Sequence, residues 1–282
     1  MTYRSLLVQL DNDRRAEARI AYALRLAREL GCRIVGAAPT GAVPLNTEAS
    51  IGRSASLADF ADAVWMALDE RAQAARARFE DACRKAGVEL HESIVEHADK
   101  AEALVRLSHC NDIVVLSQAE PDAPDFTAAR DLVADVVLQS ARPSIVLPFA
   151  GQFETVASRV LVAWDDSRAA ARAVSDSLPL LRQAEQVQVV TWERASSVAD
   201  PAWPARHQAL KRWLNAHGVA VEMRVTRTGL ALTEALLSRA ADFDADLVVM
   251  GAYGHQRWTE RLLGGMTQGV LAAMTVPVLM SH

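Results

Sequence analysis

The sequence has few cysteines, almost no lysine and no long hydrophobic run. Only three of its 282 residues are cysteines, and Cys32, Cys83 and Cys110 lie far apart, each in an apolar or helical stretch. Isolated thiols of this kind indicate reduced cysteines and exclude a disulfide framework or a zinc-binding cluster. No apolar run approaches the roughly 20 residues that cross a bilayer. The first residues do not have the pattern of a signal peptide, so a cytoplasmic location is expected.

Basic charge is also scarce and scattered. The chain has 30 Lys and Arg against 35 Asp and Glu, a formal net charge of −5 and a pI near 5.8. A nucleic-acid footprint needs concentrated basic charge, so we expect no nucleic-acid partner. With no membrane-length apolar run, we expect no membrane partner either.

Several motifs of catalysis and cofactor binding are missing. The sequence has no GxxxxGK[ST] and no GxGxxG after its first expected strand, which excludes a P-loop and the usual dinucleotide site. It has no GxSxG around Ser167 and no HExxH. We therefore predict no catalytic residue and no metal-binding residue.

The sequence contains an internal duplication. Residues 6–13 resemble residues 160–167 at an offset of 154, which aligns Asp11 with Asp165. Residues 112–117 and 143–147 resemble residues 246–251 and 277–281 at an offset of 134. The first copy therefore carries 154 − 134 = 20 extra residues between its first and fourth expected strands. A repeat of this length is domain-sized, so we predict two domains, 1–150 and 151–282.

Each copy alternates short apolar runs with helical periodicity. Apolar runs without alternation are typical of strands that helices cover on both faces, and hence of a parallel sheet. The prediction is two α/β domains in tandem, each a doubly wound, five-stranded parallel sheet. The expected strands are 5–10, 33–38, 88–95, 113–116, 144–147, 159–163, 187–192, 219–225, 247–250 and 278–280.

Glycines gather after the fourth expected strand of the second copy. Four of the 13 glycines, Gly251, Gly254, Gly264 and Gly265, fall within residues 251–267. Glycine allows close approach of the backbone to a phosphate, and a helix that starts at Gly265 would offer its positive end to an anion. A structural reading, in which these glycines only form turns and a tight helix start, fits the spacing equally well.

These residues resemble the universal stress protein family. The pattern Gly251-x2-Gly254-x9-Gly264 after Ala-Asp-Leu-Val-Val-Met is similar to that family's ATP-binding signature. The segment Leu-Val-Ala-Trp-Asp165 is similar to its first strand, and Val276-Pro277-Val-Leu to its last. The resemblance covers essentially the whole chain as two domains in tandem. It implies a Rossmann-like fold of the adenine nucleotide alpha-hydrolase type.

The resemblance also implies a ligand and roles for matching residues. ATP or another adenine nucleotide would bind in the second domain, with or without Mg²⁺. Asp165 would contact the ribose or the adenine edge, and the strand end near Trp192 would contact adenine. The ribose and phosphates would meet Gly251, Gly254, Gly264, Gly265, Met266 and Thr267. One departure is Gly265, which stands where the family has Ser or Thr, so one hydroxyl is lost unless Thr267 replaces it.

The first copy lacks the glycines. At an offset of 134, Ser117, Glu120, Arg130 and Asp131 stand where the second copy has Gly251, Gly254, Gly264 and Gly265. Their side chains would crowd the backbone approach, and the two carboxylates would repel a phosphate. We therefore expect a degenerate first domain that does not bind ATP.

The resulting functional hypothesis is a universal stress protein that binds an adenine nucleotide and acts in stress response or signalling. The two domains would meet through their last strands as an intramolecular pseudo-dimer, and two chains would pair further as a homodimer. Two alternatives stay open: a nucleotide-free member that acts as a protein-interaction module, and a slow ATP hydrolase. For Asp166, we expect a capping or solvent-facing role in preference to a carboxylate pair with Asp165.

Overall fold

The computed structural model describes residues 2–41, 55–120, 126–196, 198, 200–253 and 265–282. In the first half the strands are β1 (Ser5–Gln9), β2 (Arg33–Pro39), β3 (Leu90–Glu96), β4 (Ile113–Ser117) and β5 (Ser144–Leu147). The helices of that half are α1 (Ala16–Leu30), α2 (Ala55–Ala86), α3 (Lys100–Ser108) and α4 (Phe126–Gln139).

The second half repeats this order. Its strands are β6 (Arg159–Ala163), β7 (Gln186–Arg194), β8 (Glu222–Thr228), β9 (Leu247–Gly251) and β10 (Val278–Ser281). Its helices are α5 (Arg168–Leu181), α6 (Trp203–Ala216), α7 (Leu232–Asp242) and α8 (Gly265–Ala273). The predicted alternation of strands and helices is therefore present in both copies.

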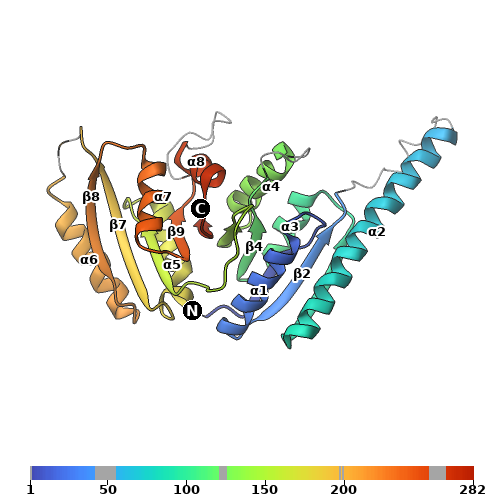
Figure 1. Ribbon diagram of the computed structural model, residues 1–282, viewed down its shortest axis with the longest axis horizontal. Helices are drawn as coiled ribbons and strands as arrows, with labels where there is room; N and C mark the ends of the chain where they lie inside the picture. Colours follow the sequence, from blue (N-terminus) through green and yellow to red (C-terminus); the bar gives the residue numbers. More distant parts are fainter. Residues whose placement is uncertain (1, 42–54, 121–125, 197, 199, 254–264) are drawn as a thin grey trace.

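All ten strands lie in one sheet, in the order β3-β2-β1-β4-β5-β10-β9-β6-β7-β8. Within each half the neighbouring strands are parallel, and β5 and β10 pair antiparallel, with Ile145 opposite Leu279. The expected contact between the two last strands is thus a direct strand pairing. The two five-stranded sheets that the sequence predicts are joined into one (Figure 1).

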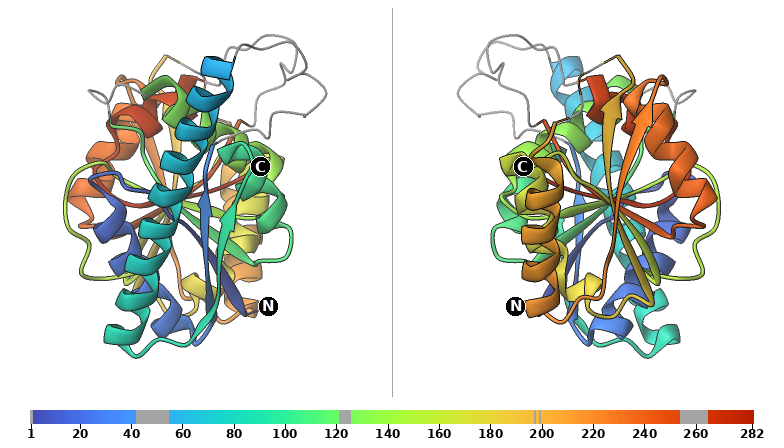
Figure 2. Two further views of the ribbon diagram at one scale, coloured as in Figure 1. Left: turned by 90° about the vertical axis from the view of Figure 1, so that its right-hand side faces the viewer. Right: turned by 90° about the vertical axis from the view of Figure 1, so that its left-hand side faces the viewer.

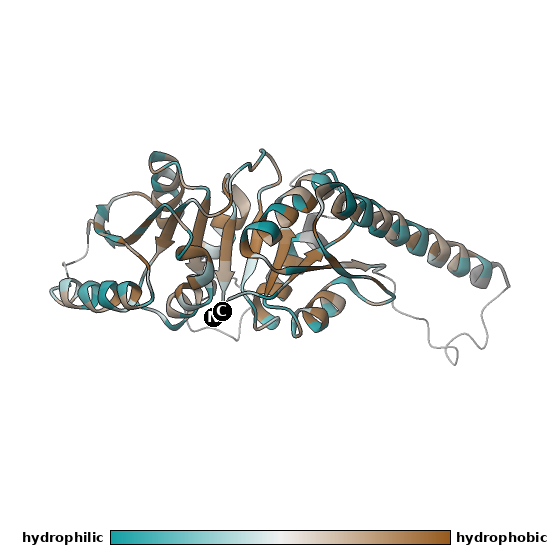
Figure 3. Ribbon diagram, turned by 90° about the horizontal axis from the view of Figure 1, so that it is seen from below, coloured by the Kyte–Doolittle hydropathy of each residue, from teal (hydrophilic) through white to brown (hydrophobic). Residues whose placement is uncertain are grey.

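Helices cover both faces of the sheet (Figure 2). One face carries α1, α2, α5 and α6, whose buried side chains belong to a single apolar cluster that runs through both halves. On the other face, α3 and α4 cover the first half, and α4, α7 and α8 cover the centre and the second half. Figure 3 shows the apolar strands between polar outer helix surfaces.

One predicted strand is shifted along the chain. The sequence predicts a strand over 219–225, whereas β8 spans Glu222–Thr228. Val219 is buried at the end of α6, where its N–H donates to the carbonyl of Leu214 at 3.0 Å after Gly218, which has φ +81°. This valine therefore belongs to the helix end and packs there, as an apolar residue after a glycine C-cap commonly does.

Among the described residues, no helix combines the length and the apolar character that a membrane span requires.

Candidate functional site

The strand order of the second half reverses between β6 and β9. From β6 the chain moves outward to β7 and β8, and it then returns to β9 on the other side of β6. Ligands of such sheets bind beyond the carboxyl ends of the strands at this reversal. The loops that follow β6 and β9 are therefore the ones to examine.

A cavity of about 630 Å³ lies at this reversal. Its volume falls in the range of roughly 300–1,000 Å³ that small-molecule sites occupy. Six of the eight predicted site residues line it: Asp165, Trp192, Gly251, Gly265, Met266 and Thr267. Gly254 and Gly264 lie outside the described residues. Residues up to 102 positions apart in the chain (165 to 267) are thus brought to one cavity.

The loop after β6 presents Asp165 to the cavity and then starts α5. Oδ1 of Asp165 accepts a hydrogen bond from the N–H of Ser167 at 3.0 Å. Ser167 caps α5 by accepting from the N–H of Ala170 at 3.1 Å. Asp166 has φ +61° and forms an ion pair with Arg206 of α6 at 3.6 Å. Ser167 is therefore the cap, Asp166 faces outward, and Asp165 is the carboxylate at the cavity.

A buried hydrogen-bond chain fixes the backbone just before Asp165. The hydroxyl of Thr191 donates to the carbonyl of Trp164 at 2.8 Å, and Nε2 of His207 lies 2.9 Å from the same hydroxyl oxygen. Because the hydroxyl proton is used on Trp164, His207 is the donor and carries its proton on Nε2. Burial lowers the pKa of His207 below its ordinary value of 6.5, against an opposing effect of Asp166. Sequence reasoning did not single out His207.

Gly251 has a packing reason to be glycine. A Cβ at this position would lie 2.5 Å from the backbone carbon of Ala169 and 2.5 Å from the nitrogen of Ala170. The end of β9 therefore touches the first turn of α5, and no side chain fits between them. For this glycine the structural reading holds, whether or not a phosphate also approaches it.

Gly265 is different. It opens α8, it is exposed, and a Cβ there would meet no atom within 4 Å. The free N–H groups and the positive end of α8 thus border the cavity, an arrangement that favours an anion.

Thr267 ties α8 to the end of β9. Its hydroxyl oxygen accepts a hydrogen bond from the N–H of Tyr253 at 3.2 Å, and the residue is buried. The hydroxyl also carries a proton that it donates to none of the described residues. Thr267 therefore supports the cavity wall and offers this donor on the described side of it.

Two lining residues carry buried polar atoms that have no hydrogen-bond partner among the described residues. These atoms are Nε1 of Trp164 and the hydroxyl of Tyr253. Burial, aided by the charge of Asp135, raises the pKa of Tyr253 to about 12, so its phenol is protonated at neutral pH and can donate. A buried donor without an acceptor costs about 1–3 kcal/mol. The cavity wall thus contains two polar groups whose hydrogen bonds the described residues do not supply.

The lining combines few charges with aromatic surface. Among the residues that the structure describes, its charged side chains are those of Asp165 and Arg194. In the described part of the chain, no three His, Cys, Asp or Glu side chains come together so as to hold a metal ion. Arg194, at the end of β7, is a lining residue that the sequence analysis did not name.

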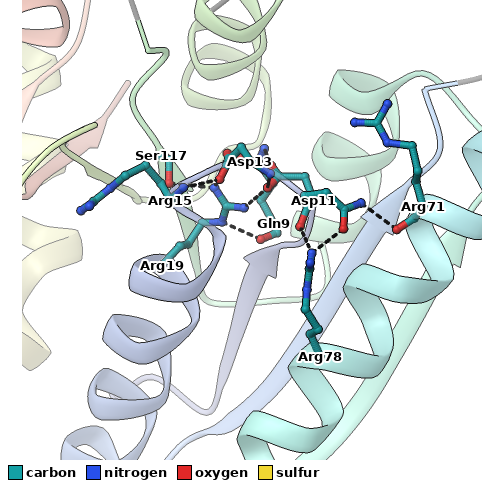
Figure 4. A network of polar contacts seen from close by, with 9 residues as sticks. Gln9, Asp11, Asp13, Arg15, Arg19, Arg71, Arg78 and Ser117 are labelled. Atoms are coloured by element: carbon teal, nitrogen blue, oxygen red, sulfur yellow. Dashed lines mark hydrogen bonds and ion pairs between the residues drawn. The ribbon is translucent and has the colours of Figure 1, made fainter.

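A buried arginine lies at the matching strand ends of the first half. Arg19 of α1 is fully buried and aligns with Ala173 at the offset of 154. Its guanidinium forms an ion pair with Asp11 and donates to Ser117 at 2.7 Å, to Asp13 at 3.1 Å and to the carbonyl of Gln9 at 2.8 Å (Figure 4). Arg19 thus links the ends of β1 and β4, where the second half has its cavity.

The charge of Arg19 is balanced by the two carboxylates. Burial alone would raise the pKa of Asp11, but the charge and hydrogen bond of Arg19 bring it below its ordinary value. Burial and the neighbouring Asp11 raise the pKa of Asp13, against the charge of Arg19. Asp11 is therefore the principal counter-ion of Arg19.

The four residues expected to obstruct the first site have other roles. Ser117 accepts from Arg19, Glu120 accepts from Arg14 at 2.8 Å, and Arg130 forms an ion pair with Asp131 at 3.3 Å. The sequence argument missed Arg19. Comparison of α1 with α5 at the same offset shows arginine where the second copy has Ala173, but it does not show that this arginine is buried.

Replacement of the two glycines by alanine should separate their roles. We expect Gly251→Ala to destabilise the protein by about 1–3 kcal/mol because the new methyl overlaps the backbone of α5. Gly265→Ala should change stability by less than about 1 kcal/mol, since the space is open. Urea unfolding followed by circular dichroism measures both. Equal losses would contradict the packing argument.

Removal of the Arg19 charge should be costly. Arg19→Met leaves Asp11 buried without its counter-ion, so we expect a loss of about 3–5 kcal/mol in the free energy of unfolding. Asp11→Asn combined with Arg19→Met should lose clearly less than the sum of the two single variants. Additive losses in urea unfolding would show that the two side chains do not act as a pair.

The neutral state of His207 should make stability depend on pH. Because the pKa is lower in the folded chain, the unfolded chain takes up a proton first as the pH falls below about 6.5. The free energy of unfolding should therefore decrease from pH 7 toward pH 5. His207→Gln keeps a donor for Thr191 and should show a smaller decrease over this range in urea unfolding. Parallel curves would contradict the assignment.

Comparisons with known proteins agree with this fold. The Universal stress protein family model matches residues 157–282, which is the second half. Across 99% of this chain, the structure is similar to that of a universal stress protein from Archaeoglobus fulgidus DSM 4304, with a TM-score of 0.75, 16% identity and 96% of that chain covered. A functionally unknown protein from Pseudomonas aeruginosa PAO1 gives a TM-score of 0.61 and 14% identity, with 99% of this chain and 92% of that chain covered.

No curated protein sequence matches the chain. At these identities the structural similarity establishes the fold of the whole chain, and the family match concerns its second half. Residues 157–282 are therefore a domain of the universal stress protein family, within a chain that has the fold of such proteins throughout.

Proposed function

We propose that the second half binds an adenine nucleotide, with ATP as the first candidate, in the cavity between β6, β9 and α8. The observation that carries this proposal is the convergence of three strand ends (β6, β7 and β9) and three helix starts (α5, α7 and α8) on one cavity of about 630 Å³. A nucleotide needs an aromatic or apolar surface for its base, a polar group for its ribose and an anion site for its phosphates. The lining supplies all three kinds of group.

Each described residue has a role in this proposal. The half-buried Trp192 and the end of β7 face the base, and Asp165 uses its second carboxylate oxygen for a ribose hydroxyl. The start of α8, with Gly265 and Met266, holds the phosphates through backbone N–H groups. Thr267 donates its remaining proton, which replaces the hydroxyl lost at Gly265. The roles of Gly254 and Gly264 stay predictions, since both lie outside the described residues.

In this proposal, the first half binds no nucleotide. The Arg19 guanidinium already bonds Asp11 and Ser117, which align with the cavity residues Asp165 and Gly251. A ligand would have to displace an ion pair whose guanidinium is fully buried. The chain would therefore bind one nucleotide and act in the cytoplasm as a nucleotide-dependent protein of stress response or signalling.

Variants at Gly265 test this proposal by isothermal titration calorimetry with ATP, with and without Mg²⁺. The intact chain should bind one ATP. Gly265→Ser adds the family hydroxyl beside that of Thr267 and should tighten the Kd about two- to tenfold, as one added hydrogen bond worth about 0.5–1.5 kcal/mol does. Gly265→Asp places a negative charge beside the phosphates and should weaken binding by more than about tenfold.

Three outcomes would contradict the proposal. Absence of heat with the intact chain would contradict nucleotide binding. Equal Kd values for the two variants would contradict a phosphate position at the start of α8. A stoichiometry of two nucleotides per chain would contradict the inference that Arg19 prevents binding in the first half. Phosphate release under excess ATP and Mg²⁺ tests the slow-hydrolase alternative, which multiple turnovers would support.

A further inference from the structure

Helix α2 is far longer than the sheet surface it covers. Its 32 residues span about 48 Å, whereas the seven residues of β2 span roughly 23 Å. Ala72, Ala75, Phe79 and Cys83 of its second part are buried on β2 and β3. This contact is close, since a Cβ on Gly36 of β2 would lie 2.5 Å from the Phe79 ring. The first part of the helix continues past the sheet into solvent (Figures 1 and 3).

The projecting part of α2 is apolar on surfaces that face solvent. Phe60 is 68% exposed, Met66 65% and Val64 42%. Between residues 59 and 69 the polar side chains are three aspartates. Three of the seven exposed large hydrophobic residues in the described part of the chain therefore fall within seven consecutive residues. A concentration of this kind on a protruding element marks a contact surface.

The two halves of α2 carry opposite charge. Residues 55–70 contain four acidic side chains and no basic one: Asp59, Asp62, Asp69 and Glu70. Residues 71–86 contain five basic side chains against Glu80 and Asp81: Arg71, Arg76, Arg78, Arg84 and Lys85. A surface with this distribution is complementary to itself when two copies lie antiparallel, and it repels itself when they lie parallel.

We propose that α2 is the homodimer interface, formed by antiparallel docking on α2 of a second copy of this chain. In the two-fold register, the axis passes between Glu70 and Arg71. Ala67 and Ala74, which are exposed on one face of the helix, then meet the partner's Ala74 and Ala67. Phe60 and Val64 lie near the same face and are covered there, and each acidic half lies along a basic half of the partner.

Other occupants fit this helix less well. The acidic residues among its exposed apolar side chains oppose an anionic lipid surface, which selects basic helices. The free edge of the sheet at β8 is a poorer place for a second copy, because Glu222, Arg224 and Arg227 line it and such charges discourage strand pairing. The proposal does not depend on nucleotide binding.

Sedimentation velocity of the full chain tests the interface. The intact protein should be a dimer at micromolar concentration, and Phe60→Glu should weaken the dimer at least tenfold. Leu230→Glu, which changes another exposed apolar residue (56% exposed), should leave it unchanged. Circular dichroism should show folded protein in each case, since both sites are exposed. A monomeric intact chain, or a dimer unaffected by Phe60→Glu, overturns the proposal.

Charge reversal tests the partner and its direction. Asp59→Arg combined with Asp62→Arg should weaken the dimer severalfold at low salt, because the acidic part would then carry the same sign as the basic part of the partner along which it lies. A dimer unaffected by this double variant overturns the antiparallel direction.

Cysteine cross-linking adds an independent geometric test, in a Cys110→Ser background that removes the exposed thiol. Ala67→Cys with Ala74→Cys should give disulfide-linked dimers on mild oxidation, and Ala67→Cys alone should not. Within one chain these positions are about 10 Å apart along the helix, which is too far for a disulfide. A cross-link with Ala67→Cys alone would overturn the antiparallel arrangement.

Discussion

The antiparallel pairing of β5 with β10 is the interaction on which the rest of the architecture depends. Each half by itself is a five-stranded parallel sheet with an unpaired edge at its last strand, and an exposed edge invites pairing with other chains. The duplication supplies a second such edge in the same molecule. The pairing removes both and places α1, α2, α5 and α6 on one continuous apolar cluster. The reversal points between β1 and β4 and between β6 and β9 then lie one in each half, where they could diverge independently.

The two halves differ in whether a large side chain occupies the reversal point. In the second half, Ala173 and Gly251 keep the crevice free of bulky groups, and Gly251 is small enough for α5 to touch the end of β9. In the first half, Arg19 and Ser117 occupy the aligned positions and bond each other across the crevice. A buried guanidinium requires counter-charges, and Asp11 and Asp13 supply them. Asp165 faces the cavity in the second copy, whereas the aligned Asp11 is an internal ion-pair partner in the first.

The extra residues of the first copy correspond to a structural difference between the two halves. They fall between its first and fourth strands, the stretch that contains the extended α2. A helix that covers the sheet with one part and carries exposed apolar and charged surface on the other adds a contact surface that α6, with 14 residues, does not have. The two copies thus differ in their crevices and in their outer helices.

The sequence by itself determined the repeat, the alternation of strands and helices, and two of the three strand ends that border the cavity, those of β6 and β9. These features follow from local patterns: apolar runs, helical periodicity and aligned offsets. It located β8 three residues too early, because the apolar residue Val219 packs at a helix end and periodicity does not distinguish the two environments.

Only the tertiary structure decided which residues meet across the crevices. Arg19 is one arginine among many in the sequence, and its burial becomes evident only when β1, β4 and α1 are in place. The link from His207 through Thr191 to Trp164 joins three separate segments. The reason for Gly251 is the approach of α5, which no spacing of glycines encodes. Local sequence specifies elements, whereas counter-ions, close contacts and cavities arise from the packing of distant elements.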